Sequence, residues 1–427
     1  MRILVSAVVL LLVGLPVAVR AQAPGAVTLE SAMVSAVDRH PTVVAAAQAL
    51  RAAEARIVVA RAGTVLAVTA NARASVGTVG SSGAPTGGAP GTSHDVSLGA
   101  SYSIYDGGIR ALQVAQAQAA LEAAQASLAV ARQDVAIAAG QAYFNVLRAQ
   151  RTVEVREAAL RTARGQVEQA EAFVRAGTGA RADVVRAQAT AATAEADLVT
   201  ARGQVEITGV QLRSAMAAPL AQALTVADPA APVPVVLAPS DAAAQAVRER
   251  SEVRRLDADV RNAEVALRIA EIRAGLLVTV SAGGVVQVSP NPGQLGWSLG
   301  ANASFPILDG GAARAEVAAA RANVAAAQAR REATVLQVQT QAYQAAAGAR
   351  DTGARVDALR VSVSAAEESL RVAEGRYRAG VGTLLEVLDA QSLATQARIN
   401  AVQALYDLYL AIVNLQYALG QPLVRRT

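Results

Sequence analysis

The chain has 427 residues, a formal net charge of +5 and no cysteine, and 53% of its residues are hydrophobic although only 3% are aromatic. The missing cysteines exclude disulfides, a lipidated N-terminal cysteine, and thiolate redox or metal chemistry. Because the charge is small and no basic–aromatic cluster occurs, we expect no nucleic-acid partner. Most of the apolar residues are Ala and Val, a composition that favours long helices packed side by side over a compact globular core.

Residues 1–21 have the pattern of a secretory signal peptide. Arg2 precedes an apolar run that is too short to span a bilayer, and Pro16 and small residues follow it. We place the cleavage after Ala21. An uncleaved membrane anchor is the alternative interpretation.

The first half of the mature chain, residues 22–218, begins with a predicted helix from Thr28 to Ala62 that His40-Pro41 interrupts. Two predicted strands follow, at 65–77 and 94–105, in which apolar and polar residues alternate. Each strand is roughly long enough to cross a bilayer when tilted. The alternation is typical of an outer-membrane barrel, and equally of an amphipathic hairpin in a soluble sheet.

A turn with a helix-capping aspartate, Asp106-Gly107-Gly108, leads into a predicted helix at 107–176. This segment contains no Pro and carries heptad positions such as Leu121 and Leu128. Its length is on the order of 100 Å, far more than an ordinary globular domain uses. The turn at Gly177, Thr178 and Gly179 then precedes a return helix at 182–216.

A Pro-rich linker, residues 219–239, separates this half from a second half at 240–420. The second half has the same order of elements: a helix capped by Ser240 and running to Ala274, strands at 277–288 and 295–308, a long helix at 310–379, a return helix at 383–419, and a tail at 421–427. Trp297, near the end of a strand, suits either a membrane interface or a core.

Three markers in the two halves share one offset of 203 residues. It connects Asp106-Gly107-Gly108 with Asp309-Gly310-Gly311, and Gly177 and Gly179 with Gly380 and Gly382. The heptad positions keep the same offset, since Val153, Leu160, Val167 and Val174 correspond to Val356, Val363, Leu370 and Tyr377. Markers that share one offset indicate an internal duplication.

Two stretches carry a resemblance to a known family. One runs from Arg376 through Gly380-Val381-Gly382-Thr383 to Glu386-Val387-Leu388-Asp389, and the other is Phe305-Pro306-Ile307-Leu308-Asp309-Gly310-Gly311. Together with the duplicated order of helices and strands, they resemble the TolC-like outer-membrane efflux proteins over nearly the whole mature chain.

The resemblance implies a mainly α-helical protein with a β-barrel part. Long antiparallel coiled-coil helices would form two tandem repeats, each contributing two strands to a twelve-stranded barrel of a homotrimer in the outer-membrane lipid. Independently of the family, a four-stranded sheet in lipid would leave unpaired edges, so insertion as a monomer is physically implausible. The resemblance also implies passive efflux or secretion with a periplasmic adaptor protein and an inner-membrane pump.

The family further implies roles for particular residues. The helix tips would contact the adaptor through Gly177, Thr178, Gly179, Gly380, Val381 and Gly382. Glu386 and Asp389, with Tyr377, would form a periplasmic gate whose carboxylates attract cations. Two departures weaken this carry-over. Gly382 stands where a well-known member has a locking Arg, and the first repeat has Asp183 and Arg186 where the second has Glu386 and Asp389.

We expect no enzymatic activity, no cofactor and no metal. The two histidines, His40 and His94, are far apart in the sequence, and there is no metal-ligand spacing, phosphate loop or nucleophile elbow. The alternative from another class is a soluble periplasmic coiled-coil scaffold or adaptor that never enters a bilayer. Such a protein would have the same heptads, but its two-faced strands would pack in a soluble sheet.

Overall fold

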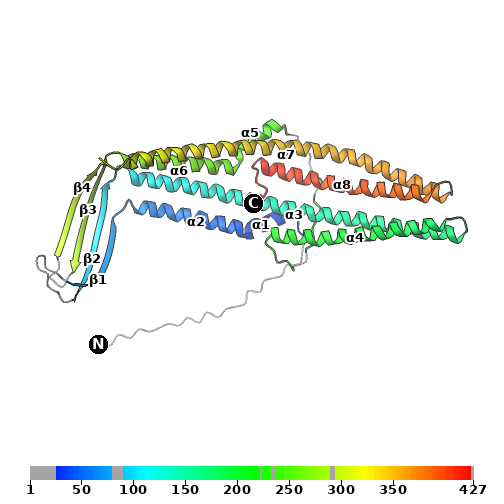
Figure 1. Cartoon of the computed structure of the whole chain (residues 1–427), viewed down its shortest axis with the longest axis horizontal. Helices are drawn as coiled ribbons and strands as arrows, with labels where there is room; N and C mark the ends of the chain where they lie inside the picture. The colour runs from blue at the N-terminus through cyan, green and yellow to red at the C-terminus, as the bar shows by residue number, and fades with distance from the viewer. Residues whose placement is uncertain are drawn as a thin grey trace, which may run out of the picture.

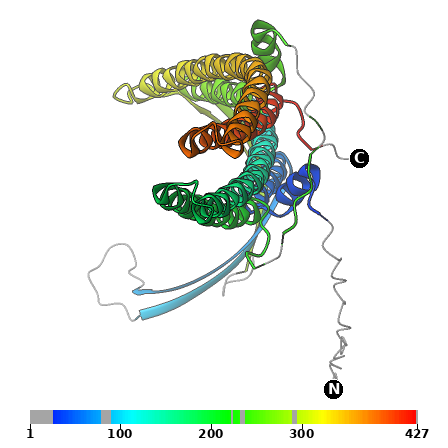
Figure 2. The ribbon, with the colours of Figure 1, turned by 90° about the vertical axis from the view of Figure 1, so that its right-hand side faces the viewer.

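The computed structural model describes residues 26–78, 90–221, 224–229, 231, 237–288 and 294–424. The predicted signal peptide, residues 1–21, lies outside the described residues. The molecule is elongated, with a sheet at one end and two helical hairpins reaching the other end (Figure 1). Viewed along its length, the elements form a C-shaped wall that is open on one side (Figure 2).

The elements of the first half are two short helices, two strands and a helical hairpin. Their bounds are α1 (Leu29–Arg39), α2 (Pro41–Ala62), β1 (Ala67–Thr78), β2 (Pro90–Tyr105), α3 (Ile109–Arg175) and α4 (Arg181–Ala215). Thr28 caps α1, because its hydroxyl accepts from the amide of Ser31. The break between α1 and α2 falls at His40, where Pro41 cannot continue the hydrogen bonds of α1.

The second half repeats this order. Its bounds are α5 (Pro239–Glu249), α6 (Ser251–Ala274), β3 (Leu277–Val288), β4 (Gln294–Ser304), α7 (Ala312–Arg378) and α8 (Leu384–Ala418). Both long helices, α3 and α7, have 67 residues, and both return helices, α4 and α8, have 35. The two hairpins therefore have the same dimensions.

The four strands form one antiparallel sheet in the order β1-β2-β3-β4. The two halves meet where β2 pairs with β3, in a register that includes Leu98 opposite Val286 and shifts between Ser103 and Tyr105. Among the described strands, β1 pairs only with β2, and β4 only with β3. Within the described residues, the sheet of a single chain therefore has two unpaired edges.

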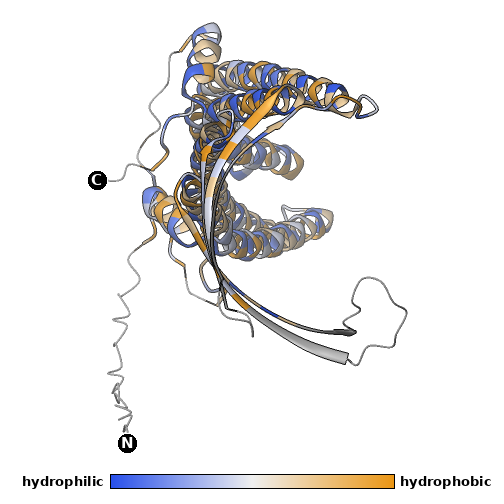
Figure 3. Ribbon diagram, turned by 90° about the vertical axis from the view of Figure 1, so that its left-hand side faces the viewer, coloured by the Kyte–Doolittle hydropathy of each residue, from blue (hydrophilic) through white to orange (hydrophobic). Residues whose placement is uncertain are grey.

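One face of this sheet is apolar, because residues paired across neighbouring strands lie on the same face. The register aligns Val68 with Ala100 and Gly284, and Ala70 with Leu98 and Val286. Hydrophobic and hydrophilic residues alternate along the ribbon of the strands (Figure 3). The exposed large apolar side chains of the sheet include Val68, Val96, Leu98, Tyr102, Ile104 and Val286.

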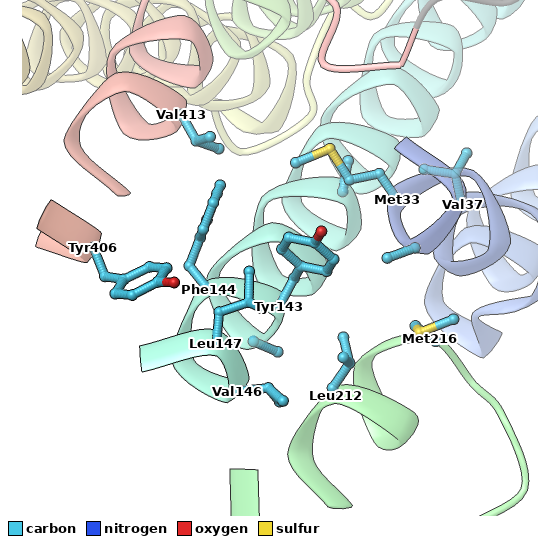
Figure 4. Close-up of a cluster of buried hydrophobic side chains, with 13 residues drawn as sticks. Met33, Val37, Tyr143, Phe144, Val146, Leu147, Leu212, Met216, Tyr406 and Val413 are labelled. Carbon is cyan, nitrogen blue, oxygen red and sulfur yellow. The ribbon is translucent and has the colours of Figure 1, made fainter. Parts of the chain in front are cut away.

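The largest apolar cluster lies at mid-length, where α1, α3, the end of α4 and α8 meet (Figure 4). Tyr143 and Phe144 are its largest fully buried side chains. The ring of Phe144 stacks on Tyr409 with centroids 5.0 Å apart. The hydroxyl of Tyr143 donates to the carbonyl of Ala227 at 2.6 Å, so this cluster also fixes part of the linker between the halves.

The structure corrects one predicted helix. The segment from Ser240 to Ala274 is not continuous, since it breaks at Arg250, and Ala238 rather than Ser240 is the N-cap residue. Arg250 has φ −66° and ψ 129°, almost the same as His40 with −66° and 131°. The break therefore has the geometry of the first half without a proline to signal it.

The contacts of Arg250 explain this break. Its buried guanidinium pairs with Glu252 at 2.6 Å and lies 4.6 Å from the ring centroid of Tyr417. The C-terminal end of α8 also approaches closely, because a Cβ added at Gly420 would lie 2.9 Å from the carbonyl carbon of Glu249. Tertiary contacts, rather than a local breaker, hold the chain in this conformation.

Strand bounds differ from the predicted ones in smaller ways. Strand β4 was expected to reach Leu308 but ends at Ser304, because Pro306 has no amide hydrogen to extend the pairing. Strand β2 begins at Pro90, four residues before the expected start. Trp297 lies in β4 opposite Gly284, but its side chain is outside the described residues, so its expected position at an interface remains a prediction.

Candidate functional site: the hairpin tips and the strand–helix turns

The two hairpin tips have the same backbone geometry. In the first, the amide of Gly177 donates to Val174 and the amides of Thr178 and Gly179 donate to Phe173, each at 3.0 Å. In the second, the amides of Gly380, Val381 and Gly382 make the corresponding bonds at 3.0 to 3.1 Å. This is the Schellman arrangement, which satisfies the last carbonyls of a helix. The duplicated sequence therefore produces two equal reversals.

The two glycines of each tip serve different purposes. Gly177 and Gly380 have φ values of 75° and 73°, which L side chains adopt only with strain. At Gly179 an added Cβ would lie 2.8 Å from the Cβ of Phe173, and at Gly382 it would lie 3.0 Å from the Cβ of Arg376. The first glycine thus permits the backbone conformation, and the second permits the close approach of the chain.

The tips of the two hairpins pack against each other through a tip cluster, which consists of Ala170, Ala187, Ala373, Tyr377, Leu384, Val387 and Ala390. The ring of Tyr377 meets Phe173 edge-on, with centroids 5.2 Å apart and an angle of 84°. Burial, and then the nearby charge of Asp183, raise the pKa of Tyr377. Tyr377 is therefore a packing residue of the interface between the hairpins as well as a predicted gate residue.

An open cleft of about 480 Å³ lies between the tips. Its lining includes the predicted adaptor residues Thr178, Gly179, Gly380 and Gly382, together with Asp183, Arg186 and Tyr377. Asp183 and Arg186 form an ion pair at 3.9 Å. Residues predicted separately from the two repeats are thus brought to a single surface.

The predicted acidic gate residues lie on the exposed side of α8. Glu386 and Asp389 are both exposed, whereas Leu384, Val387 and Ala390 face the tip cluster. The two carboxylates differ in their surroundings. Glu386 lies 3.7 Å from the guanidinium of Arg376 and beside the hydroxyl of Thr383, which caps α8. No hydrogen bond or ion pair of Asp389 is found among the described residues.

The strand–helix turns are a second group of predicted residues, at the other end of the long helices. Asp106 accepts from the amides of Gly108 and Arg110 at 3.1 and 2.9 Å, and Asp309 accepts from those of Gly311 and Ala313 at 2.9 and 2.7 Å. Each aspartate therefore satisfies free amides at a helix start. The four glycines Gly107, Gly108, Gly310 and Gly311 all have positive φ.

These amide bonds change the acidity of the aspartates. Burial tends to raise the pKa of Asp106, but its hydrogen bonds with Arg110 and Gly108 outweigh that effect and lower it. The amides of Ala313 and Gly311 lower the pKa of Asp309. In the first repeat alone, Arg110 additionally links Asp106 to the carbonyls of Gly63 and Ser103. The corresponding residue of the second repeat is Ala313, so this clamp is not duplicated.

Two contributors to the tips were missed by sequence reasoning. Phe173 was not identified as the partner of Tyr377, and Arg376 was not identified as the counter-ion of Glu386. Phe173 could have been found as the only aromatic residue near the first tip, and Arg376 by its place at the end of α7. Their pairing across two helices could not have been found without the fold.

The described part of the chain contains no group of three or more His, Asp and Glu side chains that could hold a metal ion. In the same residues, no helix has an apolar stretch of the length needed to cross a membrane.

Solved structures of other proteins share this fold. The outer membrane protein VceC from Vibrio cholerae is 20% identical with a TM-score of 0.81, and the match covers 92% of this chain and 96% of that one. The open-state MtrE outer membrane channel of Neisseria gonorrhoeae is 22% identical with a TM-score of 0.77, covering 93% and 90%. The predicted fold class is therefore confirmed: long helices in two tandem repeats, each with two strands.

Sequence comparison gives the family. The outer membrane efflux protein family matches residues 32–218 and 242–421, so the chain belongs to this family. It is therefore an outer-membrane protein, as the sequence predicted. The family consists of channel proteins and not of enzymes.

More similar relatives match only in part. Nodulation protein T of Rhizobium leguminosarum bv. trifolii is 29% identical over 185 residues, which are 42% of this chain and 39% of that protein. Nodulation protein T of Rhizobium leguminosarum bv. viciae is 26% identical over 180 residues. The matched region thus spans about two fifths of the length of these curated relatives.

Proposed function

We propose that this protein is a passive channel-tunnel for efflux or secretion, formed by three copies of the chain. Three four-stranded sheets would close a twelve-stranded barrel in the outer membrane. The helical hairpins would continue it as a tunnel through the periplasm. A periplasmic adaptor protein would bind the tips, and an inner-membrane pump would supply the energy.

The observation that carries this proposal is the four-stranded sheet. It has two free edges, β1 and β4, and one continuous apolar face. In lipid, unpaired backbone amides and carbonyls are too costly, so the edges must be paired by other copies. The C-shaped wall of the single chain fits one segment of a hollow cylinder (Figure 2).

The hairpin tips are the proposed periplasmic end. Gly177, Thr178 and Gly179 and their counterparts Gly380, Val381 and Gly382 provide two equal, closely spaced surfaces for the adaptor. The exposed carboxylates Glu386 and Asp389 would be repeated threefold at the tunnel mouth. Rings of carboxylates attract cations and resist their own closure by mutual repulsion.

The decisive experiment is single-channel recording with purified protein in a planar bilayer, together with its molecular mass in detergent. We expect discrete conductance and a trimer. We further expect that Glu386→Ala combined with Asp389→Ala changes conductance or cation preference. An unchanged channel would remove the gate assignment alone. A monomer in the soluble periplasmic fraction, without conductance, would refute the channel and favour the scaffold.

A further inference from the structure

We propose that Gln166 and Gln391 weaken the contact between the two hairpins just above their tips, and so set the equilibrium between closed and separated tips. This inference rests on the proposed channel function, because separated tips would widen the periplasmic mouth. The contact in question, here called the hairpin seam, is that of α3 and α4 with α8.

Both glutamines are buried within a single chain. Gln166 is 4% exposed and Gln391 is 6% exposed. Gln166 lies one turn from Ala170 on α3, and Gln391 lies one turn from Val387 on α8, so each continues the face that builds the tip cluster. Each helix therefore places a buried polar side chain directly next to the tip cluster. Because one chain already buries both residues, a neighbouring copy has no access to them.

Their hydrogen bonding is incomplete. Neither the amide nitrogen nor the amide oxygen of Gln166 has a partner among the described residues. Gln391 donates across the seam to the carbonyl of Ala159 at 3.1 Å, but its own oxygen lacks a partner. A buried polar atom without a partner retains its full desolvation cost, and separation of the hairpins would return it to water. The closed seam is therefore destabilised relative to an apolar one.

A further polar part of the seam lies closer to mid-length. A groove of about 510 Å³ lies between α3, α4 and α8, and its lining includes Asn145, Arg148, Gln204, Gln403 and Asp407. Arg148 and Asp407 form a half-exposed ion pair at 3.5 Å across it, and such pairs contribute little. Above this groove, the apolar cluster around Phe144 and Tyr406 joins the halves again.

The seam thus has an apolar cluster at mid-length and another at the tips. Between them, the buried glutamines and the polar groove interrupt a stretch that also buries small apolar residues such as Ala163 and Ala394. The mid-length cluster is the larger of the two. Opening at the periplasmic end would break only the tip cluster and would pivot about the mid-length cluster. Because of the two glutamines, the contact between the hairpins is least stable next to the tips.

The test measures tip separation directly. Because the chain has no cysteine, Thr178→Cys and Val381→Cys give two exposed labelling sites, one on each tip, for spin-label distance measurements on the trimer in detergent. We expect Gln166→Leu and Gln391→Leu each to lower the ratio of separated to closed tips roughly tenfold. Gln391→Met, of similar volume, gives a second apolar variant if a leucine variant does not fold.

The matched control is Gln188→Leu. Gln188 is the counterpart of Gln391 at the offset of 203, but it is exposed on α4, so the distance distribution should not change. Tip distances that stay the same or increase in the Gln166 and Gln391 variants would overturn the proposal. That outcome is expected if a buried water already satisfies the amide groups of the two glutamines. The distance measurement does not depend on conductance. If the protein conducts no ions but the two variants shift the tip distances to shorter values, only the proposed channel function is refuted.

Discussion

At the scale of single residues, corresponding positions of the two halves can have the same backbone conformation but different residue types. The ends of α4 and α8 are an example. Gly420 follows α8 with φ 73°, and its counterpart Ala217 follows α4 with φ 51°. Both ends have the same hydrogen bonds, with the amide of Ala218 donating to Arg213 at 2.8 Å and that of Gln421 to Gln416 at 3.1 Å. The first repeat thus holds an alanine in a left-handed conformation.

We expect Ala217→Gly to stabilise the protein. A left-handed alanine costs about 1–2 kcal/mol, and glycine removes this cost. Glycine also makes the unfolded chain more flexible, which favours unfolding and reduces the net stabilisation to about 0.5–1 kcal/mol. Thermal unfolding in detergent measures it. Gly420→Ala is the matched reverse change. It should destabilise by more, because the added Cβ would lie 2.9 Å from the backbone of Glu249. A loss of stability in Ala217→Gly would contradict this account.

The two proposed gate carboxylates are also unequal. The guanidinium of Arg376 offsets the charge of Glu386, whereas Asp389 has no such partner among the residues described. In single-channel recordings we expect Asp389→Asn to reduce cation preference more than Glu386→Gln does. Arg376→Gln should increase that preference, because it frees the carboxylate of Glu386. Equal effects of the two carboxylate variants would mean that the ion pair does not persist in the open channel.

At the scale of elements, the break between α5 and α6 shows how a buried charge defines a helix boundary. Arg250 is 3% exposed and has Glu252, Tyr417 and Gln341 as its contacts. The corresponding break at His40 needs no such group, because Pro41 follows it. The same backbone bend is therefore produced locally in one repeat and by tertiary contacts in the other.

We expect Arg250→Met to destabilise the protein by about 3 kcal/mol, because it leaves the carboxylate of Glu252 largely buried without its partner. Thermal unfolding of the protein in detergent measures the loss. Arg268→Met is the control: Arg268 is exposed on α6, far from the break, and its effect should stay within about 0.5 kcal/mol. The double variant with Glu252→Leu should recover much of the loss. A loss in Arg250→Met no larger than in the control would show that the pair does not hold the bend.

At the scale of the whole molecule, the two outer strands of the sheet, β1 and β4, are central to the proposed assembly. If three copies close a barrel, β4 of one copy pairs with β1 of the next. Cysteines introduced at Ala70 of β1 and along 300–304 of β4 should then form disulfides between copies, visible as covalent trimers on non-reducing gels. Ala100→Cys with Gly284→Cys is the control, because these residues pair within one chain and should give a cross-linked monomer. If cysteines at Ala70 and 300–304 instead formed disulfides within one chain, closure of the barrel by three copies would be refuted.

Much of the fold could be read from the sequence because its signals are local and repeated. The heptads predict the long helices, the alternation predicts the strands, and the glycine pairs mark the turns. The offsets between the two halves contain further information. The offset is 210 between α1 and α5 and between β1 and β3, but 203 from Asp106 and Asp309 onward. The first repeat therefore has seven additional residues between Ala67 and Asp106, and alignment at 210 would have located the break at Arg250.

What the sequence by itself determined is the periodic part of this protein: two halves with the same order of elements, their long helices and two-faced strands, and the glycines that reverse the chain. Periodicity and backbone restrictions act within a few residues, so they can be read without a fold. Only the tertiary structure decided which side chains meet across helices. The ion pair of Glu386 with Arg376, the ring contact of Phe173 with Tyr377 and the incompletely bonded Gln166 and Gln391 join or line different helices. Helix packing, which no local signal encodes, brings these side chains together.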